Sequence, residues 1–315
     1  MSEIRSSHFT IPVKGYDVVV GPGLRSRVAE IVLSIVPASL YVLLTDRNVD
    51  HLHGSALRAC FDVLGLRVLT YVLEPGEGSK QRAVKAKVED WMIENRCLRD
   101  SCIIALGGGV VGDLAGFIAA TYMRGIPFVQ IPTSFLAMVD SSIGGKTGID
   151  SPNGKNLIGA IWQPKVVLID PEFLATLPDR HLCNGIAEAI KAGAICDSSL
   201  FELLELYATD ILTKDIDLLC KVIQKSVAIK ADVVRKDERE NGMRAILNFG
   251  HSIGHAIEAL LGLEVLGDGE LLHGEAISIG MVLEATLART MGYLHTSSIR
   301  RLVNCLQCDL IFCLF

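Results

Sequence analysis

The chain of 315 residues lacks the segments that would export a protein or hold it in a membrane. Its first residues, MSEIRSSHFTIPVKG, contain no apolar signal core and do not form an arginine-rich, acid-poor transit peptide. No uninterrupted apolar run is long enough to span a bilayer. We therefore expect a soluble cytoplasmic protein with no membrane partner.

Basic clusters are missing as well. The sequence has 30 Lys and Arg residues against 36 Asp and Glu, which gives a formal net charge of −6. A mildly acidic chain without a polybasic arm has no electrostatic means of holding a phosphate backbone. This composition argues against nucleic acid as a partner.

The cysteines do not form a disulfide framework. There are nine of them, an odd number, and most lie inside apolar segments, as expected of reduced thiols. Cys305 and Cys308 form a C-x-x-C pair. A zinc knuckle needs a second pair, and no other cysteines are placed to supply one.

The first half alternates apolar strands with helical patterns. Strands are predicted over 16–21, 40–46, 67–76, 101–109, 127–134 and 165–170, and helices over 24–35, 54–65 and 80–96. Uninterrupted apolar strands that alternate with helices are typical of a parallel, doubly wound sheet. We predict an α/β domain of this kind over residues 1–177.

The sequence pattern of the second half predicts helices. Helical patterns are predicted over 183–195, 199–212, 218–236, 245–262 and 274–292, with no strand signal of similar strength between them. We place a domain boundary near Leu177–Pro178 and predict an all-α domain over 178–315.

A glycine-rich turn follows the fourth predicted strand. Gly107, Gly109 and Gly112 fit the G-x-G-x-x-G spacing, which lets a pyrophosphate approach a helix N-terminus. The turn does not follow the first strand, no acid lies about twenty residues on, and the Asp113 carboxylate would repel phosphate. A tight turn that packs a helix on the sheet is an equal alternative.

Polar residues also end two earlier strands. Asp46 and Asn48 follow one strand, and Glu77 and Lys80 follow the next. Groups at the carboxyl edge of such a sheet commonly bind ribose hydroxyls. The alternative for the second pair is a polar turn, in which Ser79 caps the following helix. Several polar strand ends on one edge favour a dinucleotide site.

The segment 138–156 is polar and glycine-rich between two apolar strands. Its Lys146, Lys155 and Asn156 are suited to a phosphate or carboxylate. The alternative is a solvated loop.

Three histidines fall close together near the end of the chain. His251 and His255 are four residues apart on a predicted helix face, and His273 opens the next helix. Ser252 stands where a zinc protease has its general base, so H-E-x-x-H is absent. With Glu188 as an oxygen donor, these residues predict a metal site. The alternative is one or two core histidines plus others on the surface.

Further charged residues lie near these histidines in the sequence. Lys191 follows Glu188 by one helical turn, and Arg244 and Asn248 precede His251. A forked guanidinium suits a phosphate or carboxylate, although the charge run RKDERE is usually a solvated face.

Taken together, these segments resemble the 3-dehydroquinate synthase family. The similar blocks are PGEGSK, LGGGVVGDLAGFIAATYMRGI, IPTSFLAMVDSSIGGKTGID, GKNLIGAIWQP, GIAEAIK and LNFGHSIGHAIE, followed by LHGEA, in this order between residues 16 and 293. The segment DERENGMRAILNFGHSIGHAIEA is most similar to the dehydroquinate synthase domain that is fused into the fungal pentafunctional AROM protein.

The resemblance implies a homodimeric enzyme that binds NAD and zinc, or cobalt in its place. It implies conversion of the seven-carbon sugar acid phosphate DAHP to 3-dehydroquinate and phosphate in the shikimate pathway, which leads to aromatic amino acids. The implied sequence is transient oxidation by NAD, phosphate elimination, reduction and intramolecular aldol closure.

The resemblance also implies roles for residues of this sequence. The metal ligands would be Glu188, His251 and His273, with His255 as a proton carrier rather than a ligand. Catalysis would involve His255, Lys146, Arg244 and Glu240. NAD contacts would be Asp46, Asn48, Glu77, Lys80, Gly108, Gly109, Asp113, Thr133, Ser134, Phe173, Thr176 and Leu177. Substrate contacts would be Asp140, Lys146, Lys155, Asn156, Lys191, Lys230, Arg244, Asn248 and His255, with Arg124 reaching the neighbouring subunit's site.

The likeness fades after LVNC, where family members continue with further helices and a lysine that grips the phosphate. We therefore expect a C-terminally truncated chain with apolar surface exposed on the helical domain and with weakened activity or stability. Full turnover of DAHP by the purified protein would contradict this expectation.

Three other functions compete with dehydroquinate synthesis. The first is a related sugar-phosphate cyclase, and the second is a metal-dependent alcohol dehydrogenase, which shares the two-domain plan. The third is an inactive NAD-binding scaffold. Lys146, Asn156, Arg244, Asn248 and His255 together favour the dehydroquinate branch, because a dehydrogenase has no reason to keep so many phosphate-binding groups.

Overall fold

The structure is a computed structural model that describes residues 8–261 and 271–308. Its contacts divide the chain into two compact units, Met1–Thr176 and Leu177–Phe315, called unit 1 and unit 2.

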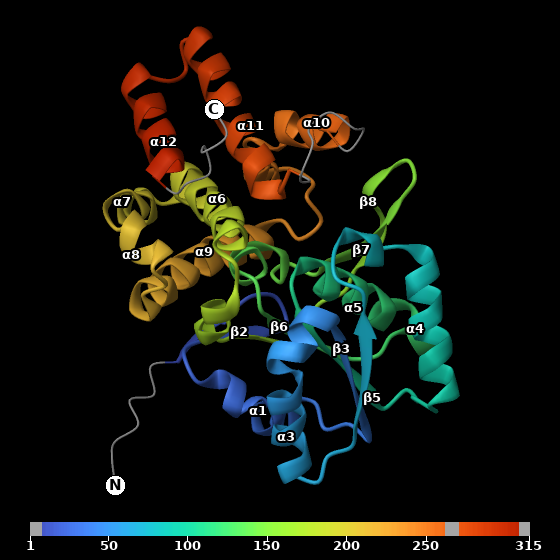
Figure 1. Cartoon of the computed structure of the whole chain (residues 1–315). Helices are drawn as coiled ribbons and strands as arrows, with labels where there is room; N and C mark the ends of the chain where they lie inside the picture. The colour runs from blue at the N-terminus through green and yellow to red at the C-terminus, as the bar shows by residue number, and fades with distance from the viewer. Residues whose placement is uncertain (1–7, 262–270, 309–315) are drawn as a thin grey trace, which may run out of the picture. The chain divides into compact units, whose positions relative to one another are not determined.

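Unit 1 is built on a seven-stranded sheet with the order β1-β2-β9-β6-β5-β3-β4 (Figure 1). Its strands are β1 (Phe9–Pro12), β2 (Asp17–Val20), β3 (Leu40–Asp46), β4 (Val68–Leu73), β5 (Ser101–Gly107), β6 (Phe128–Pro132) and β9 (Val166–Ile169). Neighbours pair in parallel except β1, which pairs antiparallel with β2 and was not predicted. The predicted parallel α/β class is confirmed.

Helices cover both faces of this sheet. They are α1 (Val28–Ile35), α2 (Arg47–Val49), α3 (Ser55–Val63), α4 (Arg82–Glu94) and α5 (Gly109–Thr121). Leu40, Val42 and Leu44 of β3 share one apolar cluster with residues of α4 and α5. The intervening Tyr41 packs on Phe61 of α3, with ring centroids 5.3 Å apart. Because side chains alternate across a strand, a sheet covered on both faces needs uninterrupted apolar strands, as this sequence has.

Short 3-10 and π turns connect these elements. They are η1 (Leu24–Ser26), η2 (Asp50–Gly54), η3 (Glu77–Ser79), η4 (Tyr122–Arg124), η5 (Ala137–Ser141) and η6 (Pro171–Thr176).

The polar segment over 138–156 is not the solvated loop that was the alternative interpretation of the sequence. It contains η5 and then strand β7 (Lys146–Ser151), which pairs antiparallel with β8 (Gly154–Ile161) as a separate two-stranded sheet. Thr147 and Ile149 are buried, and β7 packs against α5. The hairpin buries one side only, so its sequence stays polar.

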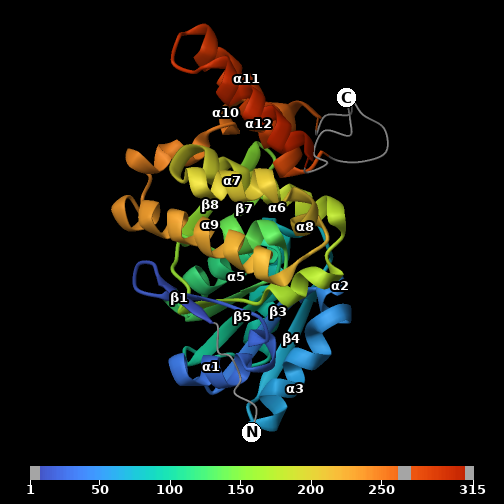
Figure 2. The same cartoon turned by 90° about the vertical axis from the view of Figure 1, so that its left-hand side faces the viewer.

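Unit 2 is helical throughout its described residues. Its helices are α6 (Asp179–Cys196), α7 (Ser198–Leu206), α8 (Ala208–Leu212), α9 (Ile216–Lys236), α10 (His251–Leu261), α11 (His273–Thr290) and α12 (Thr296–Cys308), with the 3-10 turn η7 (Met243–Asn248). Figure 2 shows α6, α7 and α9 lying together. The predicted all-helical character is confirmed, and α12 was not predicted.

One predicted helix is interrupted. The pattern over 245–262 suggested a continuous helix, but η7 ends at Asn248 and α10 begins at His251. Gly250 between them has a φ of 80°, a left-handed conformation that ends a helix and that glycine adopts without strain.

The described residues include no helix that combines the length and apolar character needed to cross a bilayer.

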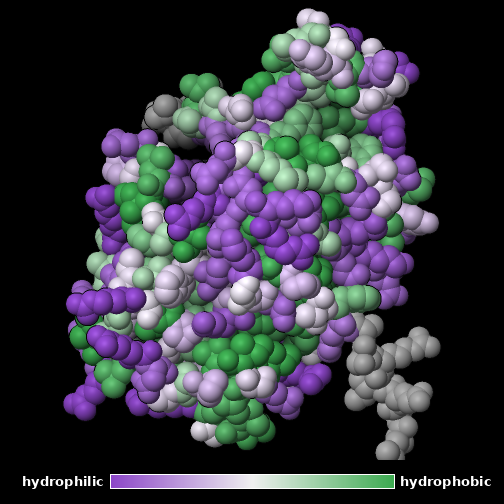
Figure 3. Space-filling model, turned by 180° about the vertical axis from the view of Figure 1, so that it is seen from behind, coloured by the Kyte–Doolittle hydropathy of each residue, from purple (hydrophilic) through white to green (hydrophobic). Residues whose placement is uncertain are grey.

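Figure 3 shows hydrophilic and apolar side chains interspersed over one face of the molecule. An exposed apolar group lies on α11 and its C-cap, where Leu283, Leu287 and Met291 are 46%, 56% and 60% exposed at four-residue spacing. One stripe of α11 therefore has no apolar cover from the described residues.

Helix α5 lies close to its neighbours because it carries small residues. A Cβ added at Gly116 would lie 2.3 Å from Cγ2 of Thr147 and 3.1 Å from Cζ of Phe128. We expect Gly116→Ala to lower the free energy of unfolding by about 1–2 kcal/mol, because overpacking outweighs the gain of about 1 kcal/mol in helix propensity. Denaturant titration measures this change.

The matched control is Gly78→Ala in the same unit, where an added Cβ meets nothing within 4 Å. A Gly116→Ala protein as stable as this control would contradict the close packing of α5.

Candidate functional site

The candidate site in unit 2 begins with a buried acid on a buried helix. Helix α6 is buried from Leu182 to Gly193, and Glu188 in its middle is 3% exposed. Lys191, one turn later, is also 3% exposed, and its Nζ lies 2.5 Å from Oε2 of Glu188. A carboxylate removed from water in this way must be compensated by positive groups or a bound cation.

Two histidines approach the other oxygen of this acid. His251 is the first residue of α10 and His273 the first of α11, and Nε2 of each lies 3.6 Å from Oε1 of Glu188. No described residue gives Oε1 a hydrogen bond. The two imidazole rings have centroids 5.3 Å apart. Three donor atoms from three helices thus converge on one point.

This geometry fits a metal ion better than a hydrogen-bonded cluster. The two distances of 3.6 Å from the histidine Nε2 atoms to Oε1 of Glu188 are too long for hydrogen bonds. Ligand bonds of about 2.0–2.1 Å in a tetrahedral zinc site place neighbouring donors roughly 3.4 Å apart. The ligand atoms of Glu188, His251 and His273 all lie within 4.8 Å of one another. One carboxylate and two imidazoles also match the donors that zinc prefers.

The protonation states support this interpretation. Burial would raise the pKa of Glu188, but Lys191, His273 and His251 hold it well below its usual range. Burial lowers the pKa of His251 to about 4, and the charge of Lys191 adds to this effect. Burial would also lower the pKa of His273, but the neighbouring carboxylates of Glu188 and Glu258 raise it to about 9. At neutral pH Glu188 is therefore ionised and His251 neutral, as ligands must be, whereas His273 is protonated in the metal-free protein and would lose one proton when an ion binds.

The orientation of His251 is set by its own backbone. Its Nδ1 lies 3.2 Å from the carbonyl oxygen of Phe249. A carbonyl can only accept, so Nδ1 carries the proton and the lone pair on Nε2 faces Glu188.

His255 lies beside this cluster but is not in the Glu188 group. Its ring centroid is 5.1 Å from that of His251 and 5.9 Å from that of His273, and its side chain is 61% exposed. The four-residue spacing of His251 and His255 suggested a metal-binding pair from the residues alone. In the structure the pair is adjacent, while Glu188 groups with His251 and His273.

Sequence reasoning missed Glu258. This acid follows His251 by two helical turns on α10, and its Oε1 lies 3.3 Å from Nδ1 of His273. Its Oε2 lies 3.9 Å from Nε2 of His255. The spacing of residues 251, 255 and 258 on one helix face was the signal that could have revealed it.

Glycines allow the three helices to come this close. A Cβ added at Gly280 of α11 would lie 1.9 Å from the carbonyl oxygen of Gly250, and one added at Gly254 would lie 2.6 Å from Cδ1 of Ile277. At the start of α11, a Cβ added at Gly274 would lie 2.1 Å from the carbonyl oxygen of Asn184 on α6. The helices therefore meet at their backbones, and their histidines converge.

A part-buried contact ties the start of α10 to α11. Oε2 of Glu284 accepts a hydrogen bond from the backbone N–H of Gly250 at 2.8 Å, and Oε1 accepts one from Ile253 at 3.4 Å. These are the donors that a helix N-terminus leaves without partners. Glu284 thus acts as an N-cap supplied by a neighbouring helix, and it too was missed from the sequence.

Three of the predicted substrate residues of unit 2 lie on α9 and in η7, which packs against α6 and α9. Arg244 is 2% exposed and donates through Nη1 to the carbonyl of Glu238 at 2.7 Å. Asn248 donates to Oε1 of Glu240 at 3.1 Å, and Lys230 is 9% exposed. The four-residue spacing of Arg244 and Asn248 predicted one face of an α-helix. In the structure both residues lie in the 3-10 turn η7.

The glycine-rich turn of unit 1 joins β5 to α5 as expected. Gly108 is the residue before the helix, and Gly109 begins it. A Cβ at Gly108 would lie 3.3 Å from Oγ of Ser134, and the N–H of Thr133 donates to the carbonyl of Gly107 at 3.0 Å. The turn therefore adjoins the end of β6, where two of the predicted NAD contacts lie.

Lys80 balances the negative charge of Asp113, which the sequence suggested would repel phosphate. Its Nζ donates to Oδ2 of Asp113 at 2.6 Å and to Oδ1 of Asn156 at 2.5 Å, and it lies 4.0 Å from Oε1 of Glu77. Burial would lower the pKa of Lys80, but Asp113 raises it above its usual value, so the pair remains ionised. The structure thus gathers three predicted residues, Asp113, Asn156 and Glu77, around the buried ammonium of Lys80.

Other predicted cofactor contacts lie elsewhere in unit 1. Asp46 caps α2, accepting from the N–H of Asn48 at 2.9 Å. Thr176 bonds through Oγ1 with Nε2 of His53 at 2.9 Å, and the His53 ring packs against Phe173 with centroids 4.9 Å apart. His53 was not predicted.

The remaining predicted contacts are separated from these groups. Leu177 is the first residue of unit 2, and its carbonyl accepts a hydrogen bond from Nζ of Lys214 at 2.7 Å. Lys146 and Lys155 are exposed on the hairpin, Asp140 is half-buried in η5, and Arg124 is exposed at η4.

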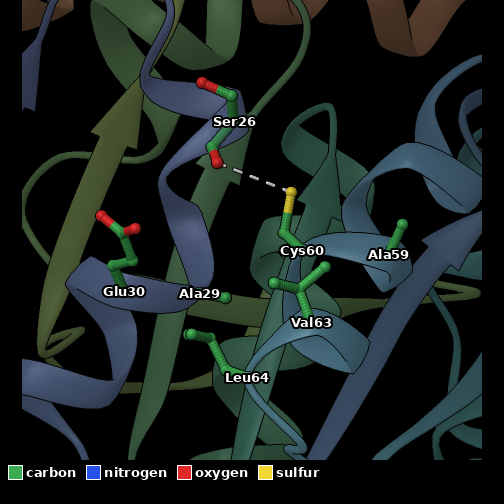
Figure 4. Close-up of a pocket in the computed structure, with 7 residues that line it drawn as sticks. All are labelled: Ser26, Ala29, Glu30, Ala59, Cys60, Val63 and Leu64. Atoms are coloured by element: carbon green, nitrogen blue, oxygen red, sulfur yellow. Dashed lines mark hydrogen bonds between the residues drawn. The ribbon is translucent and has the colours of Figure 1, made fainter.

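Two surface hollows lie apart from these groups. One, of about 260 Å³, lies between η1, α1 and α3 and contains Cys60, whose Sγ donates to the carbonyl of Ser26 at 3.7 Å (Figure 4). Burial raises the pKa of this thiol, which keeps it protonated and a poor nucleophile. The other, of about 510 Å³, lies in unit 2 and has a largely apolar lining that includes Phe201, Phe249 and Leu302. Neither hollow contains the converging donors of the Glu188 cluster.

Comparison with known families accounts for this combination of fold and site. Residues 70–184 match the family model described as 3-dehydroquinate synthase N-terminal, and residues 185–309 match the one described as 3-dehydroquinate synthase C-terminal. The chain belongs to the 3-dehydroquinate synthase family.

Solved structures of sugar-phosphate cyclases resemble this family member closely. The 2-epi-5-epi-valiolone synthase of Streptomyces hygroscopicus subsp. jinggangensis 5008, solved with NAD+ and Zn2+, is 30% identical, with a TM-score of 0.86 over 97% of this chain and 83% of that one. A 2-deoxy-scyllo-inosose synthase, complexed with carbaglucose-6-phosphate, NAD+ and Co2+, is 25% identical, with a TM-score of 0.87 over 98% and 83%.

An iron-containing alcohol dehydrogenase of Thermotoga maritima shares the fold alone. It is 13% identical, with a TM-score of 0.65 over 94% of this chain and 87% of that chain. The two-unit plan is therefore common to cyclases and dehydrogenases.

The cap supplied by Glu284 gives a stability test for the start of α10. We expect Glu284→Ala to lower the free energy of unfolding by about 1–2 kcal/mol, because two N-terminal donors lose a charged acceptor. Denaturant unfolding of the metal-free protein measures this loss.

The control is Glu202→Ala on the exposed surface of α7, which we expect to change stability by no more than about 0.5 kcal/mol. Equal stability of the two variants would mean that the Glu284 contact contributes nothing to the fold.

Proposed function

We propose that the chain is a 3-dehydroquinate synthase, a phosphate-eliminating lyase that converts DAHP to 3-dehydroquinate and phosphate in the shikimate pathway. The observation that carries this proposal is the convergence of Glu188, His251 and His273, in a chain whose two halves match the two models of that family. The free cysteines among the described residues fit a reducing compartment, and we propose the cytoplasm.

The proposal assigns one group of residues to each cofactor. Glu188, His251 and His273 would hold Zn2+, or Co2+ in its place, as judged from their donor set and spacing. Gly108 and Gly109 would admit NAD at the N-terminus of α5, beside Thr133 and Ser134. When bound, the metal would polarise substrate oxygens as a Lewis acid, and NAD would accept and return a hydride.

The protein's main task in this reaction is to position one flexible substrate. The overall conversion is redox-neutral, because the hydride removed from the substrate returns to it after phosphate has left. Buried Lys191, Lys230 and Arg244 supply positive charge for the phosphate and carboxylate of DAHP. Lys146 and Asn248 would add further hydrogen bonds, which hold the chain in a reactive conformation.

His255 would carry a proton at its Nε2. This atom lies 3.9 Å from Oε2 of Glu258, and the side chain is accessible to solvent. Glu240, which accepts the hydrogen bond from Asn248, would help to orient the substrate-binding residues around η7.

A second candidate is a related cyclase that acts on another sugar phosphate. The similarity to the valiolone and deoxy-scyllo-inosose synthases favours it, since both structures align with nearly the whole chain. The two candidates differ in the substrate's carboxylate, which DAHP has and a simple sugar phosphate lacks.

Substrate choice tests the proposal. The full chain, loaded with NAD and zinc, should release inorganic phosphate from DAHP and form 3-dehydroquinate, measured by a phosphate assay and by mass spectrometry. A heptulose phosphate without the carboxylate and a hexose 6-phosphate are the matched controls, and both should react at least about 100-fold more slowly. Faster release from either control would favour the second candidate.

We further propose a homodimer in which Arg124 contributes to the partner's site. Arg124 is exposed, and both it and Met123 have positive φ values, of 68° and 49°. Such backbone strain persists where it serves a purpose. Analytical ultracentrifugation should give a dimer, and Arg124→Ala should lose DAHP turnover while remaining dimeric. A monomer with full activity would contradict this proposal.

A further inference from the structure

His273 uses both ring nitrogens, and each faces a different acid. Its Nε2 lies 3.6 Å from Oε1 of Glu188, and its Nδ1 lies 3.3 Å from Oε1 of Glu258. An ionised carboxylate can only accept a hydrogen bond, so the Glu258 contact places the proton on Nδ1. Nε2 is then the atom that would lose its proton and direct a lone pair toward a cation beside Glu188.

The position of Glu258 on α10 makes this contact specific. The acid lies two turns after His251 on the same helix, so one face of α10 presents both His251 and the carboxylate that holds His273. The Glu258 side chain is only 8% exposed. An acid this buried must interact with polar partners, and those shown are His273 and His255.

We propose that Glu258 is a positioning residue for the metal centre: it fixes the tautomer and ring orientation of His273 and does not itself bind the ion. This inference rests on the metal site assigned in the proposed function. Acids that hold the second nitrogen of a metal-binding histidine typically change metal affinity 10–100-fold when removed.

The alternative is that Glu258 is itself a ligand, together with His255 and His273, whose donor atoms also lie within 4.8 Å of one another. That arrangement would leave Oε1 of Glu188 buried without a hydrogen bond, since Lys191 approaches the other oxygen. It would also rely on His255, whose side chain is 61% exposed. Both points favour the site at Glu188.

Metal affinity, measured without any substrate, tests the inference. Zinc is titrated into the metal-free full chain in competition with a chromophoric chelator, and bound Co2+ is followed by its visible absorption. Glu258→Gln should weaken zinc binding about 10–100-fold and alter the Co2+ spectrum. Glu202→Gln, which removes the same charge from the surface of α7, should change neither. Thermal unfolding of the metal-free variants shows whether each is folded.

A double-mutant cycle with His273→Ala separates the two roles. If Glu258 acts through His273, Glu258→Gln should cause no further loss of affinity in the His273→Ala protein. An equal further loss there would identify Glu258 as a ligand and overturn the inference. Unchanged zinc affinity of the single Glu258→Gln variant would overturn it as well. A wild-type chain that binds no zinc would instead refute the proposed metal site, and this inference with it.

Discussion

The buried carboxylate of Glu188 constrains the rest of unit 2. It sits in the middle of a helix whose other neighbours are almost all buried, so its charge cannot be solvated by water. Compensation has to come from the protein or from a bound cation. Lys191 approaches one oxygen and two histidines approach the other, which requires the starts of α10 and α11 to meet at α6. The backbone contacts at Gly280, Gly254 and Gly274 are what that meeting demands.

The two units handle charge in different ways. In unit 1 the ionised Lys80 neutralises Asp113 beside the glycine turn, so the start of α5 keeps its backbone donors without an adjacent uncompensated carboxylate. In unit 2 the balance around Glu188 is open to an additional cation. The first arrangement is suited to an anionic ligand such as a dinucleotide, and the second to a metal.

The sequence was sufficient for the parts of the fold that periodicity controls. Strands such as 101–107 are buried on both faces, so their apolar runs predicted a parallel sheet. The hairpin β7–β8 was missed because it buries only one side and its residues are polar. Helix α10 was predicted to begin too early, since the break at Gly250 depends on a left-handed φ that apolar periodicity does not register.

The candidate site was only partly accessible to sequence reasoning. His251, His255 and His273 stand out by type and spacing, but the residues alone did not decide which of them would group with Glu188. The grouping follows from helix packing, which glycines control at long range. Glu258 and Glu284 resemble ordinary surface acids in the sequence. Their contacts with His273 and with the N–H of Gly250 exist only once α10 and α11 are in place.

The backbone-to-backbone meeting of α10 and α11 at Gly250 and Gly280 has a further consequence. Where helices are separated by long side chains, their spacing can drift as those side chains change rotamer. Here no side chain intervenes, so the distance between the start of α10 and the middle of α11 is set by covalent geometry and atomic radii. An incoming ion would find its donors already assembled, and little ordering entropy would oppose its capture.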